Sequence, residues 1–186
     1  MYSFCGRQIR LGHRAFALKS GACPHCDRTG TLNRHSRLYG NDYASAQRDA
    51  RRLRGQRVHC SACGTRGGCG RTFPIYLADV LPRHSVPGAL LTLLLVGLLA
   101  GTSVHAAAAA QPLLGPFSLL TFYRLAARLG RQNDHLRVLL SGVSTPPPCA
   151  HADPLRETIA HLRAVFAAAA DLVAAFQLRF QVPLLL

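Results

Sequence analysis

Cys23-Pro24-His25-Cys26 and Cys60-Ser61-Ala62-Cys63-Gly64-Thr65-Arg66-Gly67-Gly68-Cys69-Gly70-Arg71-Thr72-Phe73 bound the stretch that decides the fold. Two thiolates separated by two residues can turn back onto one metal ion, and a second group further along completes a tetrahedron. Such an ion stabilises a segment that is too small to fold on its own core. The sequence therefore predicts a zinc ribbon.

Cys23, Cys26 and Cys60 are the three ligands that the spacing indicates directly. The fourth is open between Cys63 and Cys69. Cys63 has the spacing of a standard knuckle. Cys69 is followed by a glycine and then by a predicted strand with an aromatic residue, which is the order expected after a last ligand. We favour Cys69 and keep Cys63 as the alternative; the nearby His25, His35 and His59 could substitute but are expected at the surface.

The tetrapeptide that begins at Cys23 also occurs at the active site of thiol oxidoreductases, where the first thiolate lies at a helix N-terminus in a thioredoxin-like sheet. An arginine-rich segment and further cysteines follow it here instead of a βαβ pattern, so we prefer the metal site. Five of the seven cysteines fall between Cys23 and Cys69, which indicates reduced thiols around a metal in a cytosol. Cys5 and Cys149 are predicted bystanders.

The segment between the two cysteine groups has the pattern of a hairpin. Residues 29–39 predict the outgoing strand, Gly40-Asn41-Asp42 the turn and 54–59 the return, and residues 71–77 predict a third strand. The 33 residues between Cys26 and Cys60 exceed the usual ribbon interval, but the cost of closing a loop grows only logarithmically with its length. Residues 1–21 are expected to form a strand or flap against this ribbon.

Arginine dominates the predicted hairpin. Residues 28–57 hold eight arginines against Asp42 and Asp49, a local surplus of six positive charges, which suits an arm that faces phosphates. The alternative is a solvated hairpin whose charges only confer solubility. The predicted phosphate contacts are Arg34, Arg37, Arg51, Arg52, Arg54 and Arg57.

The whole chain is strongly basic. Its 186 residues carry a formal charge of +14, which calls for an anionic partner, either nucleic acid or acidic lipid. Lys19 is the only lysine, and arginine forks onto phosphates and guanine edges. Residues 1–19 have no long apolar run of a secretory signal, so we expect a cytoplasmic protein.

An uncharged apolar segment follows the boundary at Pro82 and Pro87. Residues 85–104 are long enough to cross a bilayer. Pro87, Gly97 and Gly101 favour buried helices of a small bundle instead. The alternative is a membrane-anchored protein with one span near 87–104 that holds a basic zinc domain in the cytosol.

Two helices are predicted next. Residues 102–110 fit a short capped helix, residues 111–116 a turn, and Ser118 caps a helix through Leu129. Apolar residues occupy one side of this last helix and arginines another, which is the layout of a helix-turn-helix reader, although an amphipathic helix with a solvated face would look the same. The residues predicted nearest a DNA groove are Ser118, Thr121, Arg124, Arg128 and Arg131.

The C-terminal third begins with a linker. Residues 141–153 contain three consecutive prolines, and Asp153-Pro154 then opens a helix. Its apolar residues step by four and three in a seam that we expect to dock on the bundle, with a homodimer as the alternative. The seam is Leu155, Ile159, Leu162, Phe166 and Ala169. Residues 176–186 are predicted to be an irregular apolar tail.

The predicted fold is α+β and mostly α: a three-stranded zinc ribbon, a small helical bundle and a C-terminal helix. The expected units are 1–82 for the ribbon, 83–141 for the helix-turn-helix-like domain, 142–152 for the linker and 153–186 for the C-terminal helix and tail.

In this order, the motifs resemble the zinc-ribbon and helix-turn-helix front end of bacterial insertion-sequence transposases, and more closely the small stand-alone proteins of that kind. The resemblance covers residues 20–130, and its specific part is the ribbon. It implies binding to the DNA ends of a mobile element. The segments that carry it are Cys23-Pro-His-Cys26, Arg54-Gly-Gln-Arg-Val-His-Cys60, Gly68-Cys-Gly-Arg-Thr-Phe73, Leu77-Ala-Asp-Val-Leu-Pro-Arg-His84 and Thr121-Phe-Tyr-Arg-Leu125.

Carboxylates are too few for a transposase nuclease. Cutting and joining DNA needs a carboxylate cluster around two metal ions, yet only four acidic residues lie beyond Tyr123. No nucleophile elbow, P-loop or dinucleotide fingerprint occurs either. We therefore expect a non-catalytic, zinc-stabilised protein that binds double-stranded DNA. A protein-binding adaptor is a further alternative.

Overall fold

The sheet is built on the long hairpin that joins the two cysteine groups. The computed structural model describes residues 16–41, 51–63, 67–110, 117–148 and 153–185. Strands β1 (Leu32–Asn41), β2 (Arg51–Cys60) and β3 (Thr72–Tyr76) form an antiparallel sheet in the order β1-β2-β3, which confirms the three predicted strands. Leu32 pairs with Cys60 at one end of the hairpin and Asn41 with Arg51 at the other. The predicted turn at residues 40–42 is thus wrong for Gly40 and Asn41, which still pair within β1, and Asp42 lies outside the described residues.

A small core lies on one face of the sheet. Its buried side chains are Leu18, Cys23, Leu32, Val58, Cys60 and Ile75. Val58 and Cys60 are two residues apart on β2, as expected for one face of a strand. Leu18 comes from helix α1 (Phe16–Ser20), in a region that we predicted to be a strand or flap; most of that region lies outside the described residues. Gly55 lets β3 approach closely, because a Cβ there would lie 2.2 Å from the carbonyl oxygen of Ile75.

The apolar segment forms a buried helix. Helix α2 (Gly88–Leu99) contributes five buried leucines to the main core, so one short element supplies its centre. The helix is 12 residues long. Across the described ranges, no helix has both the length and the apolar character that a membrane crossing requires. The run at 87–104 that raised this alternative is therefore interrupted by the turn after Leu99.

Helices α3 (Val104–Ala109) and α4 (Leu119–Ser141) follow. The predicted cap of α3 is confirmed, because the Ser103 hydroxyl accepts a hydrogen bond of 3.1 Å from the amide of Ala106. The predicted end of α4 at Leu129 is wrong, because Asn133, Leu136 and Leu140 continue the buried stripe for three more turns. The predicted turn at 111–116 lies outside the described residues.

Two helices, not one, form the C-terminal part. Helix α5 (Pro154–Val165) starts as predicted, with the Asp153 carboxylate accepting from the amide of Leu155 at 3.0 Å. It ends at Val165, so Phe166 is its cap and Ala169 lies outside the helix. The predicted irregular tail begins inside helix α6 (Leu172–Phe180), whose first turn is capped by Asp171.

The predicted seam of α5 lies against the bundle. Ile159 and Leu162 are buried in the main core, and Leu155 and Phe166 pack against it. The C-terminal helices therefore share one core with α2 and α4. The Pro-rich segment before α5 is described only through residue 148.

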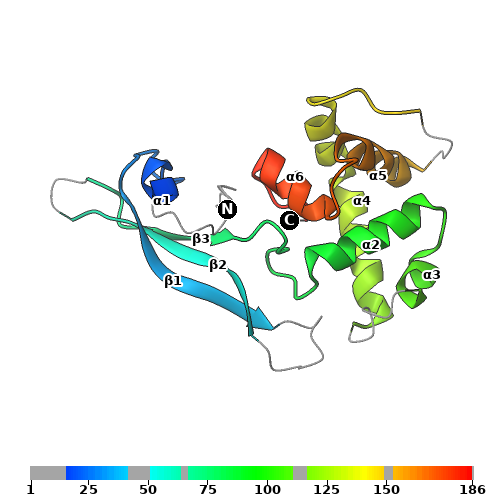
Figure 1. Cartoon of the computed structure of the whole chain (residues 1–186), viewed down its shortest axis with the longest axis horizontal. Coiled ribbons are helices and arrows are strands. Elements are labelled where there is room, and N and C mark those ends of the chain that lie inside the picture. Colours follow the sequence, from blue (N-terminus) through cyan, green and yellow to red (C-terminus); the bar gives the residue numbers. More distant parts are fainter. Residues whose placement is uncertain (1–15, 42–50, 64–66, 111–116, 149–152, 186) are drawn as a thin grey trace.

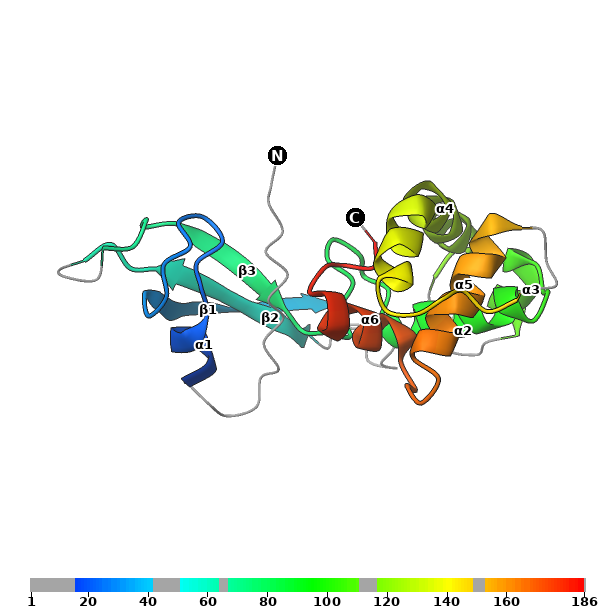
Figure 2. The same cartoon turned by 90° about the horizontal axis from the view of Figure 1, so that it is seen from above.

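The sheet and the bundle lie next to each other along the long axis of the molecule, with α6 nearest the sheet (Figures 1 and 2). Gln177 of α6 holds the segment that joins them. Its fully buried side-chain amide donates to the carbonyl oxygens of Ala78 and Val80, at 2.5 and 3.0 Å. The chain order therefore brings the last helix back to the exit of the sheet.

Candidate functional site

Four cysteines form one cluster at the end of the sheet. The Sγ atoms of Cys23, Cys26, Cys60 and Cys69 all lie within 4.8 Å of one another, and two of these pairs are 3.7 Å apart. A tetrahedral zinc ion with bonds of about 2.3 Å would place its sulfur ligands about 3.8 Å apart. The cluster thus has the dimensions of a zinc site. Cys63 is exposed and lies outside the cluster, so the structure brings together the set that includes Cys69.

Backbone turns position the four thiols. The turn after Cys23 is closed by the Asp27 amide, which donates to the Cys23 carbonyl at 2.8 Å. Cys60 ends β2, and the amide of Gly70 donates to its carbonyl at 3.0 Å. A glycine is required at position 68, because a Cβ there would lie 2.2 Å from the Ser61 carbonyl oxygen and 2.6 Å from the Cys60 sulfur. The two cysteines of the second knuckle, Cys60 and Cys69, are therefore nine positions apart, instead of the usual three.

Hydrogen bonds make the thiols of the cluster unequal. Burial raises the pKa of Cys23 to about 12. Burial also opposes ionisation of Cys60, but its hydrogen bonds with the Thr31 hydroxyl at 3.2 Å, the Cys69 amide at 3.4 Å and the Cys23 and Cys26 thiols outweigh burial and lower the pKa of Cys60 to about 7. Zinc binds thiolates, so a bound ion would favour loss of the proton from each of the four thiols.

The three histidines near the cluster are placed elsewhere. His25 and His35 are exposed and His59 is half-buried. His25 packs edge-on against Phe73, with the ring centroids 5.9 Å apart. Within the residues that the structure describes, the cluster consists of sulfur donors alone, which is the soft donor set that zinc accepts in structural sites.

The six arginines predicted to face phosphates fall into two groups. Four are exposed on the hairpin, namely Arg34, Arg37, Arg51 and Arg57. The other two bind the bundle side of the molecule: Arg52 forms an ion pair with Asp79, and Arg54 donates to the carbonyl oxygens of Leu81, at 2.9 Å, and of His84. Burial lowers the pKa of Arg54. Both side chains therefore have a structural role at the junction that the sequence did not indicate.

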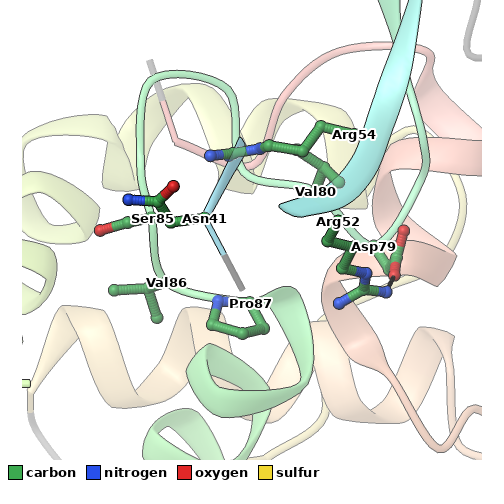
Figure 3. A pocket seen from close by; sticks show the side chains of 8 residues that line it. All are labelled: Asn41, Arg52, Arg54, Asp79, Val80, Ser85, Val86 and Pro87. Carbon is green, nitrogen blue, oxygen red and sulfur yellow. Dashed lines mark hydrogen bonds and ion pairs between the residues drawn. The ribbon is translucent and has the colours of Figure 1, made fainter. Parts of the chain in front are cut away.

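Figure 3 shows the small pocket at this junction, where a dashed line joins Arg52 to Asp79. Its charged lining side chains already bind one another or backbone carbonyl oxygens. We therefore interpret the pocket as a gap in the packing between sheet and bundle and not as an anion site. The lining residues are Asn41, Arg52, Arg54, Asp79, Val80, Ser85, Val86 and Pro87.

The five residues predicted nearest a DNA groove lie between the N-cap of α4, Ser118, and the middle of the helix. Ser118, Arg124 and Arg131 are exposed, whereas Thr121 and Arg128 are half-buried. The Ser118 hydroxyl lies 3.0 Å from that of Thr121. Arg128 donates to Nε2 of His84 at 3.0 Å, so it is partly occupied within the protein.

Large apolar side chains on the same part of α4 were missed by the sequence reasoning. Leu120 is 54% exposed and Tyr123 is 46% exposed, and both adjoin Arg124 along the helix. Their exposure could not be predicted from the sequence. The apolar periodicity of α4 shows that one face of the helix is buried, but not how many residues that face includes. The exposed face of α4 thus carries large apolar and aromatic side chains beside its arginines.

Comparisons with protein-family models, with curated proteins and with solved structures find no match for this chain.

Proposed function

We propose that the chain is a non-catalytic DNA-binding protein whose sheet is held by a zinc ion on Cys23, Cys26, Cys60 and Cys69. The observation that supports it best is the cluster of four sulfur atoms within 4.8 Å at the base of a basic hairpin. The ion would close the loop between the two cysteine groups and so fix the direction of the hairpin. Its role is structural, because four protein ligands leave no open position for chemistry.

The duplex-binding surface in this proposal is the exposed side of α4. Arg124 and Arg131 are exposed seven residues apart, which places them on one face of the helix. An α-helix fits the major groove, and arginine contacts both phosphates and guanine edges. The four exposed arginines of the hairpin add phosphate contacts. A link to transposase-related proteins of mobile elements is part of the proposal and is supported by the motif resemblance.

A salt-dependent binding experiment tests the proposal. The zinc-loaded chain is titrated with labelled duplex DNA at several salt concentrations, and log K should fall linearly with log salt. Arg124→Ala with Arg131→Ala should weaken binding and reduce the slope. Arg163→Ala with Arg179→Ala is the matched control, because it removes two exposed arginines from α5 and α6. Absent or salt-insensitive binding would refute the proposal and favour the adaptor alternative, in which the chain docks another protein.

A further inference from the structure

The exposed part of the β1–β2 hairpin carries an aromatic side chain among its arginines. Tyr39 of β1 is 50% exposed. Arg37 lies two residues before it, on the same side of the strand, and its Nη1 is 3.5 Å from the Tyr39 hydroxyl. Both side chains are exposed, so a guanidinium and an accessible ring lie together on one strand.

One further cation shares the face of this pair. Arg51 pairs with Asn41, two residues beyond Tyr39, so its side chain lies on the same side of the sheet, whereas Arg57 pairs with Ser36 and lies on the other side. Neither β1 nor β2 contains an acidic residue. The surface therefore attracts phosphates. Its aromatic ring can in addition contact an apolar or aromatic group of a ligand, which a phosphate does not have.

We propose that this part of the hairpin binds single-stranded nucleic acid, with an unpaired base stacked on Tyr39 and the flanking phosphates on Arg37 and Arg51. Basic grooves with exposed aromatic rings are how proteins bind single strands without sequence preference. A base within a duplex presents only its edges to a protein, so the ring requires an unpaired base. The inference goes beyond duplex binding by α4 and does not require it.

The strand geometry argues against the other occupants of a basic sheet edge. β1 is an edge strand, and a peptide could in principle add to it as a further strand. The register of the hairpin, however, shifts between Arg34 and Ser36, where His35 is an extra residue in β1. Such a bulge interrupts the regular row of backbone groups that strand addition needs. An acidic peptide could pair with the arginines but would gain nothing from the ring.

Binding of the zinc-loaded full chain to a labelled oligo-dT strand tests the proposal. Tyr39→Ala should weaken binding by about tenfold, the effect of losing one stacked base. Tyr39→Phe keeps the ring and should bind within about twofold of the wild type. Val138→Ala is the control, because Val138 is an exposed apolar side chain, 72%, on the second half of α4 and outside both proposed binding surfaces; it should leave oligo-dT binding unchanged.

A second readout follows the ring itself. The chain has no tryptophan, so fluorescence excited at the tyrosine band reports its five tyrosines. Oligo-dT should quench this emission in the wild type, and the quench should be smaller in Tyr39→Phe although binding persists. Duplex DNA without overhangs separates the two proposals, because Tyr39→Ala should bind it as the wild type does.

Three results would overturn the inference. These are unchanged oligo-dT binding by Tyr39→Ala, an equal loss in Tyr39→Phe, or competition by poly-glutamate as effective per charge as by oligo-dT. The first two would show that the ring makes no stacking contact, and the last that the surface binds any polyanion. None of them touches duplex binding by α4, so the failure of one proposal is distinguishable from the failure of the other.

Discussion

Arg128 of α4 donates a hydrogen bond of 3.0 Å to Nε2 of His84, while the backbone carbonyl of His84 accepts from Arg54 of β2. One residue in the connecting segment therefore links the sheet to the helix with the proposed duplex-binding face. The ring can accept this bond only in its neutral form, with the proton on Nδ1. Burial, and then the charges of Arg128 and Arg54, lower the pKa of His84 in agreement with this geometry.

Acid should weaken this link. In the folded chain the pKa of His84 lies below its ordinary value of about 6.5, so the unfolded chain binds more protons below that pH. The contribution of His84 to the free energy of unfolding is therefore complete above about pH 6.5 and is lost as the pH falls from there toward the lower folded pKa. Urea unfolding of the zinc-loaded chain at pH 7.5 and 5.5 should show a larger loss for the wild type than for His84→Gln, which keeps an acceptor without a titrating ring. Equal losses would contradict the prediction, since all other titrating groups are common to both proteins.

Replacement of Cys69 should lower the zinc content, whereas replacement of Cys63 should leave it unchanged. Cys69→Ser removes a ligand of the cluster, so the purified protein should lose about one zinc per chain or bind it far more weakly. Cys63→Ser is the internal control, because this exposed thiol lies outside the cluster, and its metal content should equal that of the wild type. Metal analysis by mass spectrometry decides between them, and the reverse pattern would exchange the two ligands.

Arg54 should matter for stability more than any exposed arginine of the hairpin. Arg54→Met removes the side-chain donor from the carbonyl oxygens of His84 and Leu81, of which Leu81 keeps the amide of His84, and should lower the free energy of unfolding by about 1 to 3 kcal/mol. Arg57→Met is the matched control on the same strand and should change it by less than about 0.5 kcal/mol, because Arg57 is exposed. Chemical denaturation measures both, and similar effects would show that Arg54 has no special role at the junction.

Gln177 is also expected to stabilise the junction between sheet and bundle, from the side of α6. Its amide group donates to two carbonyl oxygens, and its carbonyl accepts from the amide of Leu184 at 3.4 Å. Gln177→Met fills the same space without these bonds and should destabilise the fold by about 2 to 4 kcal/mol. Gln177→Glu, which keeps the acceptor and loses the donor, should also destabilise it. A neutral effect of both substitutions in thermal unfolding would refute the role assigned to the donor.

Local patterns predicted most of the secondary structure. The three strands, the start of α5 and the cap of α3 each follow from turn residues, alternation or a capping side chain within a few positions. Three cysteines of the cluster followed in the same way. The ends of helices were less predictable: α4 continues through Gly130 because packing outweighs its low propensity. Helix α6 was missed although Asp171, directly before an apolar run, is a capping signal.

Contacts between distant residues could not be predicted. Arg52 and Arg54 look like the other arginines of the hairpin, and only the fold shows that their partners lie about 30 positions later, in the segment that leads to α2. Cys69 was favoured over Cys63 because a glycine and a strand with an aromatic residue follow it, whereas the spacing alone allowed either. The structure brings Cys69 into the cluster.

The hairpin separates the cluster from its far end by nine paired positions, from Leu32 and Cys60 to Asn41 and Arg51, or about 30 Å along the strands. Residues added to or removed from the distal end in matched pairs would therefore leave the sulfur geometry untouched. The same cysteine cluster can therefore support hairpins of different length.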